Sequence, residues 1–159
     1  MKGLTDKIRD ILKKLEIKEL PIPLEKVANL FSIKVIYYPS FPDHVSGIII
    51  NREGLLAIGI NSDKPKVRQR FTLAHELGHF LLGHEIDEKI IEGIYDRPTD
   101  QEREANEFAA ELLVPKDFLE KDIKEKLIVL KIPELARRYE VSEQAISVRL
   151  LETGLINQI

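Results

Sequence analysis

The sequence predicts an α+β fold in which a small three-stranded antiparallel or mixed sheet packs on helices. Strand-like runs are grouped between residues 32 and 61, while helical periodicity is confined to the segments before and after them. This segregation is typical of α+β proteins and not of alternating α/β ones. The length of 159 residues matches the roughly 100–200 residues of one domain. We therefore expect a single domain over residues 1–159.

Two helices are expected before the sheet, at residues 4–15 and 23–31, because apolar side chains recur there at intervals of three and four. Three strands follow at residues 32–38, 45–51 and 55–61, which are rich in β-branched and aromatic residues. The last two runs are joined by a short polar segment that ends in glycine, which predicts a hairpin.

Only helices are expected after the sheet. A long helix should run over residues 63–82, where Gly83 ends it, and a second should run over residues 101–114, before a proline. The tail holds further helices, and residues 132–155 resemble a helix-turn-helix with Ser142 as the N-cap of its second helix.

The composition excludes several classes of protein. With 24 basic and 27 acidic residues the formal net charge is −3, which argues against a protein that coats nucleic acid. Cysteine is absent, so disulfides, thiol nucleophiles and cysteine-based metal sites are excluded. No apolar run approaches the roughly 18 residues that span a membrane, and the N-terminus has no signal-peptide core. We expect a cytoplasmic protein without membrane association.

The residues that carry chemistry are His75-Glu76-Leu77-Gly78-His79, an HExxH motif on a predicted helix. Residues i and i+4 differ by about 40° around a helix, so both imidazoles face one point and can bind Zn²⁺. Glu76 lies beside them, where a carboxylate can accept a proton from water. Gly78 costs about 1 kcal/mol relative to alanine in mid-helix, and we expect it where another helix approaches closely.

A catalytic zinc takes three protein ligands, and histidine does not readily supply the third. His84 lies nine residues after His75, about 180° round the same helix. It therefore faces away from the site unless Gly83 turns the chain, and a capping or structural role is expected for it.

A carboxylate from the helix at 101–114 is the better candidate for the third ligand. Glu104 lies at the edge of the apolar stripe of this helix, where a side chain can reach into a cleft. Glu102 falls within the stripe but at the frayed N-terminal end, and Glu111 lies two turns further on. Periodicity alone gives Glu104 a modest lead.

At these residues the sequence resembles the ImmA/IrrE family of zinc-dependent endopeptidases. The matching segments are residues 70–84, RFTLAHELGHFLLGH, and residues 104–115, EANEFAAELLVP, which has the pattern EANxFAAELLxP. The resemblance extends over roughly residues 20–155. It is specific because the HExxH motif and the second segment occur together at this distance.

The resemblance implies a zincin-like helical core with a gluzincin-like site. One Zn²⁺ per chain would be held by His75, His79 and Glu104, with Glu76 as the general base. It also implies a metalloprotease whose substrate is a helix-turn-helix transcriptional repressor, and hence an antirepressor in the regulation of a mobile element, a prophage or a stress response.

Two further expectations concern the substrate. Tyr95, in the loop between the two metal-binding helices, is a candidate for stabilising the transition state. The peptide is expected to lie as an extended strand along the edge of the sheet, with residues 55–61 as the candidate edge.

The competing hypothesis is a metal-binding regulator, or the toxin component of a two-gene module, that acts by binding and not by hydrolysis. Glu76 favours the enzyme, because a purely structural metal site needs no base beside it. Direct DNA binding by the tail is not expected, because residues 133–153 carry three arginines and four glutamates.

Overall fold

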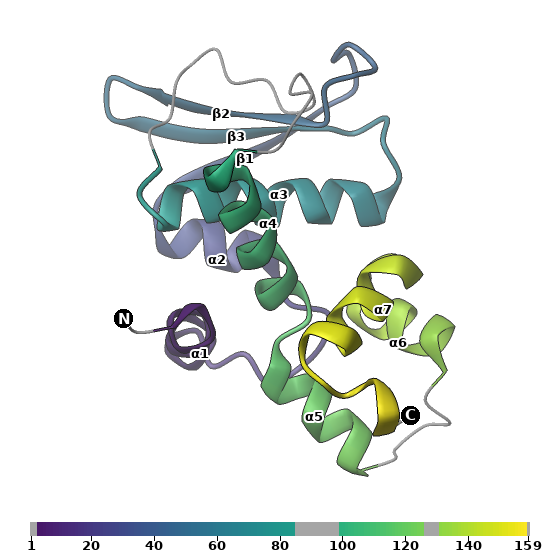
Figure 1. Ribbon diagram of the computed structural model, residues 1–159. Helices are drawn as coiled ribbons and strands as arrows, with labels where there is room; N and C mark the ends of the chain where they lie inside the picture. Colours follow the sequence, from purple (N-terminus) through teal and green to yellow (C-terminus); the bar gives the residue numbers. More distant parts are fainter. Residues whose placement is uncertain (1–2, 85–98, 126–130, 159) are drawn as a thin grey trace. The chain divides into compact units, whose positions relative to one another are not determined.

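The computed structural model describes residues 3–84, 99–125 and 131–158, and it confirms an α+β fold with a three-stranded mixed sheet (Figure 1). In chain order the elements are α1 (Leu4–Lys14), α2 (Leu24–Leu30), β1 (Ile33–Tyr38), β2 (Gly47–Arg52), β3 (Leu55–Asn61), α3 (Lys66–Leu81), α4 (Asp100–Leu113), α5 (Lys116–Glu125), α6 (Ile132–Tyr139), α7 (Glu143–Glu152) and the 3₁₀ turn η1 (Ile156–Gln158).

The chain divides into two compact units. One unit comprises residues 23–109 and contains the sheet, α2, α3 and most of α4. The other comprises residues 1–22 and 110–159 and contains α1 and the C-terminal helices.

The sheet of the first unit has the strand order β1-β3-β2. The central strand β3 pairs in parallel with β1 and antiparallel with β2. The expectation that residues 55–61 form an edge of the sheet is therefore wrong. Its position between two strands agrees with its burial: Ala57, Ile58 and Ile60 are all buried.

The hairpin between β2 and β3 is confirmed. Its two central residues, Glu53 and Gly54, have φ angles of 50° and 79°. Positive φ at both positions is typical of the type I′ turn, whose twist matches that of the flanking strands.

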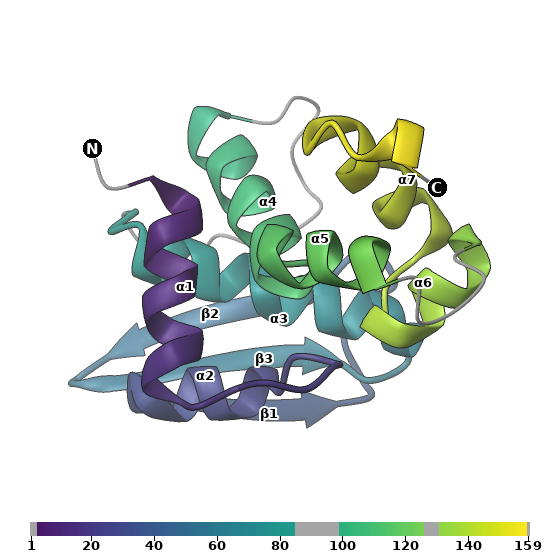
Figure 2. The ribbon, with the colours of Figure 1, turned by 90° about the horizontal axis from the view of Figure 1, so that it is seen from below.

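Helices α2 and α3 cover one face of the sheet (Figures 1 and 2). The two helices contact each other through Phe31 and Phe80, whose rings pack edge to face with centroids 6.2 Å apart. The residues of α3 from Thr72 to His79 are all buried. Four of them, Thr72, His75, Glu76 and His79, form a polar stripe on this helix. Because the stripe is enclosed by protein, its side chains require partners.

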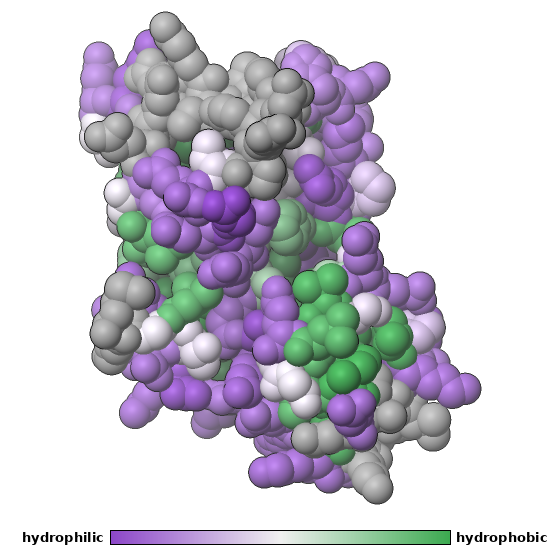
Figure 3. Space-filling model, in the orientation of Figure 1, coloured by the Kyte–Doolittle hydropathy of each residue, from purple (hydrophilic) through white to green (hydrophobic). Residues whose placement is uncertain are grey.

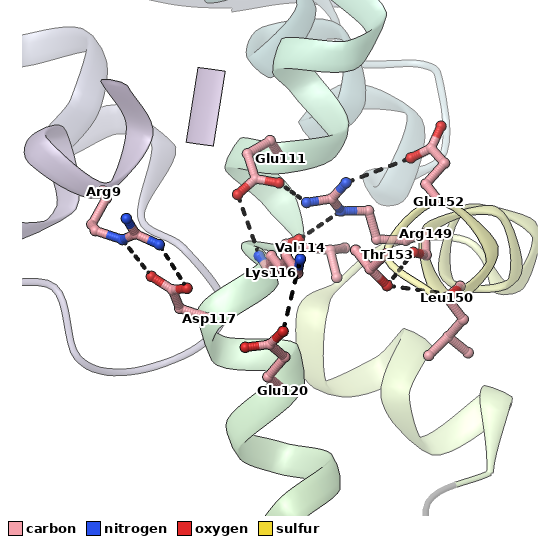
Figure 4. Close-up of polar contacts among 10 residues, drawn as sticks. All are labelled: Arg9, Glu111, Val114, Lys116, Asp117, Glu120, Arg149, Leu150, Glu152 and Thr153. Carbon is pink, nitrogen blue, oxygen red and sulfur yellow. Dashed lines mark hydrogen bonds and ion pairs between the residues drawn. The ribbon is translucent and has the colours of Figure 1, made fainter. Parts of the chain in front are cut away.

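The second unit has two buried carboxylates, of Glu111 and Asp122, whose ion pairs join its helices. Arg149 of α7 pairs with Glu111 at the end of α4, and its Nε donates to the carbonyl oxygen of Val114 at 2.9 Å (Figure 4). Asp122 of α5 accepts hydrogen bonds from Arg138 and from the Tyr139 hydroxyl.

Two helices lie where the helix-turn-helix-like tail is expected. Glu140 takes the left-handed conformation after α6, with φ 51°, at the position where a turn glycine would be favoured. Ser142 then caps α7 by accepting a hydrogen bond from the backbone N–H of Ala145.

The C-terminal helices present apolar side chains to the surface. Figure 3 shows a hydrophobic area over them, to which Val148 and Leu151 of α7 contribute with exposed fractions of 44% and 65%. Among the described residues, none of the helices is both long enough and apolar enough to span a bilayer.

Candidate metal centre

The centre is built on the polar stripe of α3. His75 and His79 are one helical turn apart, and their Nε2 atoms lie 3.0 Å from each other. Glu76 is next to His75 in the chain, and all three residues are buried, with exposed fractions between 2% and 8%. Leu73, Ala74 and Leu77 pack into the core around them, so the helix can keep the imidazoles in a single orientation.

Helix α4 contributes a carboxylate to the two imidazoles. One oxygen of Glu102 lies 3.0 Å from His75 Nε2, and the other lies 3.0 Å from His79 Nε2. The ligand atoms of His75, His79 and Glu102 all lie within 4.8 Å of one another. Two imidazole nitrogens and a carboxylate oxygen that face one point are a donor set suited to a divalent metal ion.

Glu104, the carboxylate expected as the third ligand, contacts a different histidine. Its carboxylate lies 2.7 Å from His84 Nε2, and its side chain is 58% exposed against 16% for Glu102. Glu102 lies on the same face of α4 as the buried residues Ala105 and Ala109. That face is turned toward α3.

The N-terminal end of α4 is capped, which explains why Glu102 is held in place. The hydroxyl of Thr99 accepts a hydrogen bond from the backbone N–H of Glu102 at 3.2 Å, and its carbonyl accepts one from Arg103. The segment from Thr99 to Glu102 has the S/T-x-x-E spacing of a capping box. This spacing is a signal in the sequence that would have indicated an ordered first turn.

Asn106 binds the imidazole of His75 through the ring nitrogen that does not face Glu102. It lies four residues after Glu102 on the same face of α4, and its Oδ1 is 2.8 Å from His75 Nδ1. An amide oxygen accepts a hydrogen bond, so His75 carries its proton on Nδ1 and presents the Nε2 lone pair to Glu102.

His84 reaches the imidazole of His79 because the chain turns sharply after α3. Gly83 has φ 73°, the backbone N–H of His84 bonds to the carbonyl of His79, and that of Gly83 bonds to Phe80. This is the Schellman pattern, which folds the residue after the glycine back over the last helical turn. As a result His84 Nδ1 lies 2.9 Å from His79 Nδ1.

Gly78 sets the distance between the two helices. A methyl group there would lie 3.1 Å from Phe108 Cβ and 3.2 Å from the carbonyl oxygen of Ala105. The expected close approach of a second helix at this glycine is confirmed. It brings the backbone of α4 close enough for the short side chain of Asn106 to reach α3.

The electrostatics of the centre favour the unprotonated forms of two ligand atoms, those of His79 and Glu102. Burial, with a contribution from the neighbouring His75, lowers the pKa of His79 to about 4. The close contact with His75 lowers the pKa of Glu102, against the opposing effect of burial. Neutral imidazoles and an ionised carboxylate are the forms that bind metals.

The position of the proton on His75 also fits a bound metal ion. With His75 protonated on Nδ1, its Nε2 lone pair faces Glu102 and His79 at hydrogen-bond distance. Lone pairs that face one another repel unless a cation lies between them. The centre can therefore hold a metal ion through His75, His79 and Glu102.

Comparison with known proteins agrees with this geometry. The family model described as the IrrE N-terminal-like domain, a peptidase family, matches residues 28–151. The chain belongs to the ImmA/IrrE family. The domain is thus a peptidase-type domain in which a metal-binding group lies between α3 and the N-terminal part of α4.

The fold has a counterpart among solved structures. A Mycobacterium tuberculosis transcriptional regulator superposes with a TM-score of 0.66 over 94% of this chain, at 18% sequence identity. The ImmA/IrrE chain covers 46% of that regulator, and at this identity the similarity shows the fold alone. No curated protein shows a significant match to the chain.

Of the other residues singled out in the sequence, Tyr95 lies outside the described residues. Glu111, a weaker candidate for the third ligand, belongs to the second unit, where it pairs with Arg149 and accepts a hydrogen bond from the backbone N–H of Lys116.

Proposed function

We propose that this chain is a zinc-dependent endopeptidase that hydrolyses a peptide bond in a protein partner. The observation that carries the proposal is the convergence of His75, His79 and Glu102 beside Glu76, on two buried helix faces. Two nitrogens and one carboxylate oxygen leave a fourth position open, which is the arrangement of a catalytic zinc site. Among divalent metals, zinc suits this mixed imidazole and carboxylate set well.

A zinc ion held there would act as a Lewis acid that polarises the scissile carbonyl and lowers the pKa of an adjacent water molecule. The chain supplies the rest of the chemistry. Glu76 takes the proton of the attacking water and later delivers it to the leaving amine. His75, His79 and Glu102 remain fixed during this transfer, because outer hydrogen bonds and packing hold them. The site is gluzincin-like in this assignment.

For the substrate we propose a helix-turn-helix transcriptional repressor in the cytoplasm, so that the protein acts as an antirepressor. Membership in the ImmA/IrrE family supports this class of substrate. The structural neighbour is itself described as a transcriptional regulator, which is consistent with a role near transcription.

The tail is proposed to contact protein and not DNA. Its arginines are paired with carboxylates: Arg138 with Asp122 and Arg149 with Glu111. Arg137 lies 3.4 Å from Glu134. With these positive charges matched, and with exposed apolar side chains on α7, the surface is poorly suited to phosphates.

The test combines metal content with cleavage of a proteome-derived peptide library followed by mass spectrometry. We expect about one zinc per chain in the wild type, and cleavage that Glu76→Gln abolishes while zinc is retained. Glu102→Gln should lose both. Glu107→Gln makes the same charge change on the exposed face of α4 and should change neither.

Two results would overturn the proposal. One is a wild-type protein without metal after zinc addition and dialysis. The other is cleavage that persists in Glu76→Gln, because no other group is assigned the proton transfer. A protein that keeps zinc and binds its partner without cleaving it would instead favour the regulator that acts by binding.

A further inference from the structure

The imidazole of His79 is held by a second layer of side chains that the metal group itself does not include. His84 Nδ1 lies 2.9 Å from His79 Nδ1, and His84 Nε2 lies 2.7 Å from Glu104 Oε2. The three side chains form a continuous row of hydrogen bonds that runs from the metal centre to the solvent. Glu104, at the outer end, is 58% exposed, whereas His84 is buried.

The direction of every hydrogen bond in this row follows from its outer end. A carboxylate accepts hydrogen bonds and donates none, so His84 must donate through Nε2. A neutral imidazole that is protonated on Nε2 has its lone pair on Nδ1. His84 therefore accepts through Nδ1, and His79 must donate through its own Nδ1. The proton of His79 is thereby placed on the nitrogen that points away from Glu102.

We propose that His84 and Glu104 are positioning residues that fix the tautomer and the ring orientation of His79 for metal binding. The proposal rests on the metal centre assigned above. It gives Glu104 a role that differs from direct ligation, and it makes His84 the counterpart for His79 of what Asn106 is for His75. Partners of this kind raise the basicity of a ligand and hold its ring in place.

The backbone supports the same arrangement. The Schellman turn at Gly83 places His84 directly over His79, with a backbone hydrogen bond of 3.0 Å between the two residues. The ring contact is therefore built into the end of α3, and it does not depend on a long flexible side chain. Glu104 reaches His84 from the first turns of α4, so the pair also ties that helix to the end of α3.

The experiment measures two properties of the purified protein. In the metal-free state, two-bond ¹H–¹⁵N correlation spectra report which nitrogen of each imidazole carries the proton. The dissociation constant for Zn²⁺ is then measured by competition with a chromophoric chelator. The variants are Glu104→Gln, His84→Leu, His84→Gln and the double variant, and Glu107→Gln is the control for loss of one negative charge on α4.

We expect His79 to be protonated on Nδ1 in the wild type and in Glu107→Gln, with equal zinc affinities. Glu104→Gln and His84→Leu should show a mixture of tautomers and a dissociation constant raised about 10–100-fold. His84→Gln offers an amide oxygen to His79 and should recover part of the loss. Because Glu104 acts through His84, the double variant should be no weaker than His84→Leu alone.

Other outcomes overturn the proposal. Unchanged tautomers and affinities in Glu104→Gln and His84→Leu would show that the row has no positioning role, while the metal centre stands. An effect of Glu104→Gln above about 1,000-fold, far beyond what outer partners contribute, with Glu102→Gln close to wild type, would make Glu104 a ligand. A wild type that binds no Zn²⁺ would remove the metal centre together with its outer partners.

Discussion

Replacing Gly78 with alanine tests the packing that places α4 against the metal centre. The new methyl group would lie 3.1 Å from both Cβ and Cδ1 of Phe108 and 3.2 Å from the carbonyl oxygen of Ala105. Two of these atoms belong to, or are fixed to, the backbone of α4. The contacts can be relieved only if that helix moves outward by a few tenths of an ångström.

Two effects of opposite sign decide the result for Gly78→Ala. Removing a mid-helix glycine favours the folded state by up to about 1 kcal/mol. Inserting a methyl group into a packed interface costs about 1–3 kcal/mol. We expect the second effect to dominate, with the free energy of unfolding lowered by about 1 kcal/mol, and Gly78→Val should lower it further. Since Glu102 moves with α4, zinc affinity should fall about tenfold, as for other shifts of supporting groups.

The assays are urea denaturation of the metal-free protein and chelator competition for Zn²⁺. A second measurement isolates the contact: in a Phe108→Ala background the Cδ1 contact is gone, so Gly78→Ala should cost less there. A Gly78→Ala variant that is more stable than the wild type by about 1 kcal/mol, the full helix-propensity gain, and that binds zinc equally well would show that the two helices are not in tight contact here.

Three further predictions concern stability. Arg149→Met leaves the buried carboxylate of Glu111 without its partner and should cost about 3–5 kcal/mol in urea denaturation; adding Glu111→Leu should recover most of it, and a loss below about 1 kcal/mol would contradict the pairing. In the metal-free protein the unfolded chain binds a proton at His79 below its ordinary pKa of 6.5, while the folded chain does so only near pH 4. The free energy of unfolding should therefore fall by about 3 kcal/mol as pH is lowered through this window, and His79→Gln should flatten the curve; equal slopes would refute the assignment. Glu53→Asn places a residue that tolerates positive φ in the hairpin turn and should raise the free energy of unfolding by a few tenths to about 1 kcal/mol, measured by thermal denaturation; a lower melting temperature would contradict the turn type.

Much of the fold was predictable because it follows from local patterns. The helix that carries the HExxH motif, the glycine that ends it and the hairpin at residues 52–54 all depend on spacing and on turn residues a few positions apart. The place of β3 was not predictable in the same way. Its pairing with β1 joins segments more than 20 residues apart, and alternation along a strand does not show how many neighbours it has.

The residues of the candidate site likewise differ in whether local patterns were enough to predict them. His75, Glu76 and His79 lie on one turn of a helix, so their convergence is a property of helix geometry. The choice between Glu102 and Glu104 depends on how α4 is rotated about its own axis as it packs on α3. Periodicity placed Glu102 within the apolar stripe, and the Thr99 cap is the reason that this end of the helix is ordered.

The amino-acid sequence was sufficient for the class of fold, for the pair of imidazoles with an adjacent carboxylate, and for the resemblance to the ImmA/IrrE family. The packing of the helices was needed to show which carboxylate faces the imidazoles and which side chains bind the outer nitrogen of each ring. The difference arises from how far apart in the chain the residues that determine each feature lie. A helix fixes the relative directions of its own side chains within one turn, whereas the approach of two helices is set by contacts such as that of Gly78 with Phe108. The Schellman turn that places His84 over His79 is local, but the carboxylate that His84 contacts, that of Glu104, belongs to the other helix.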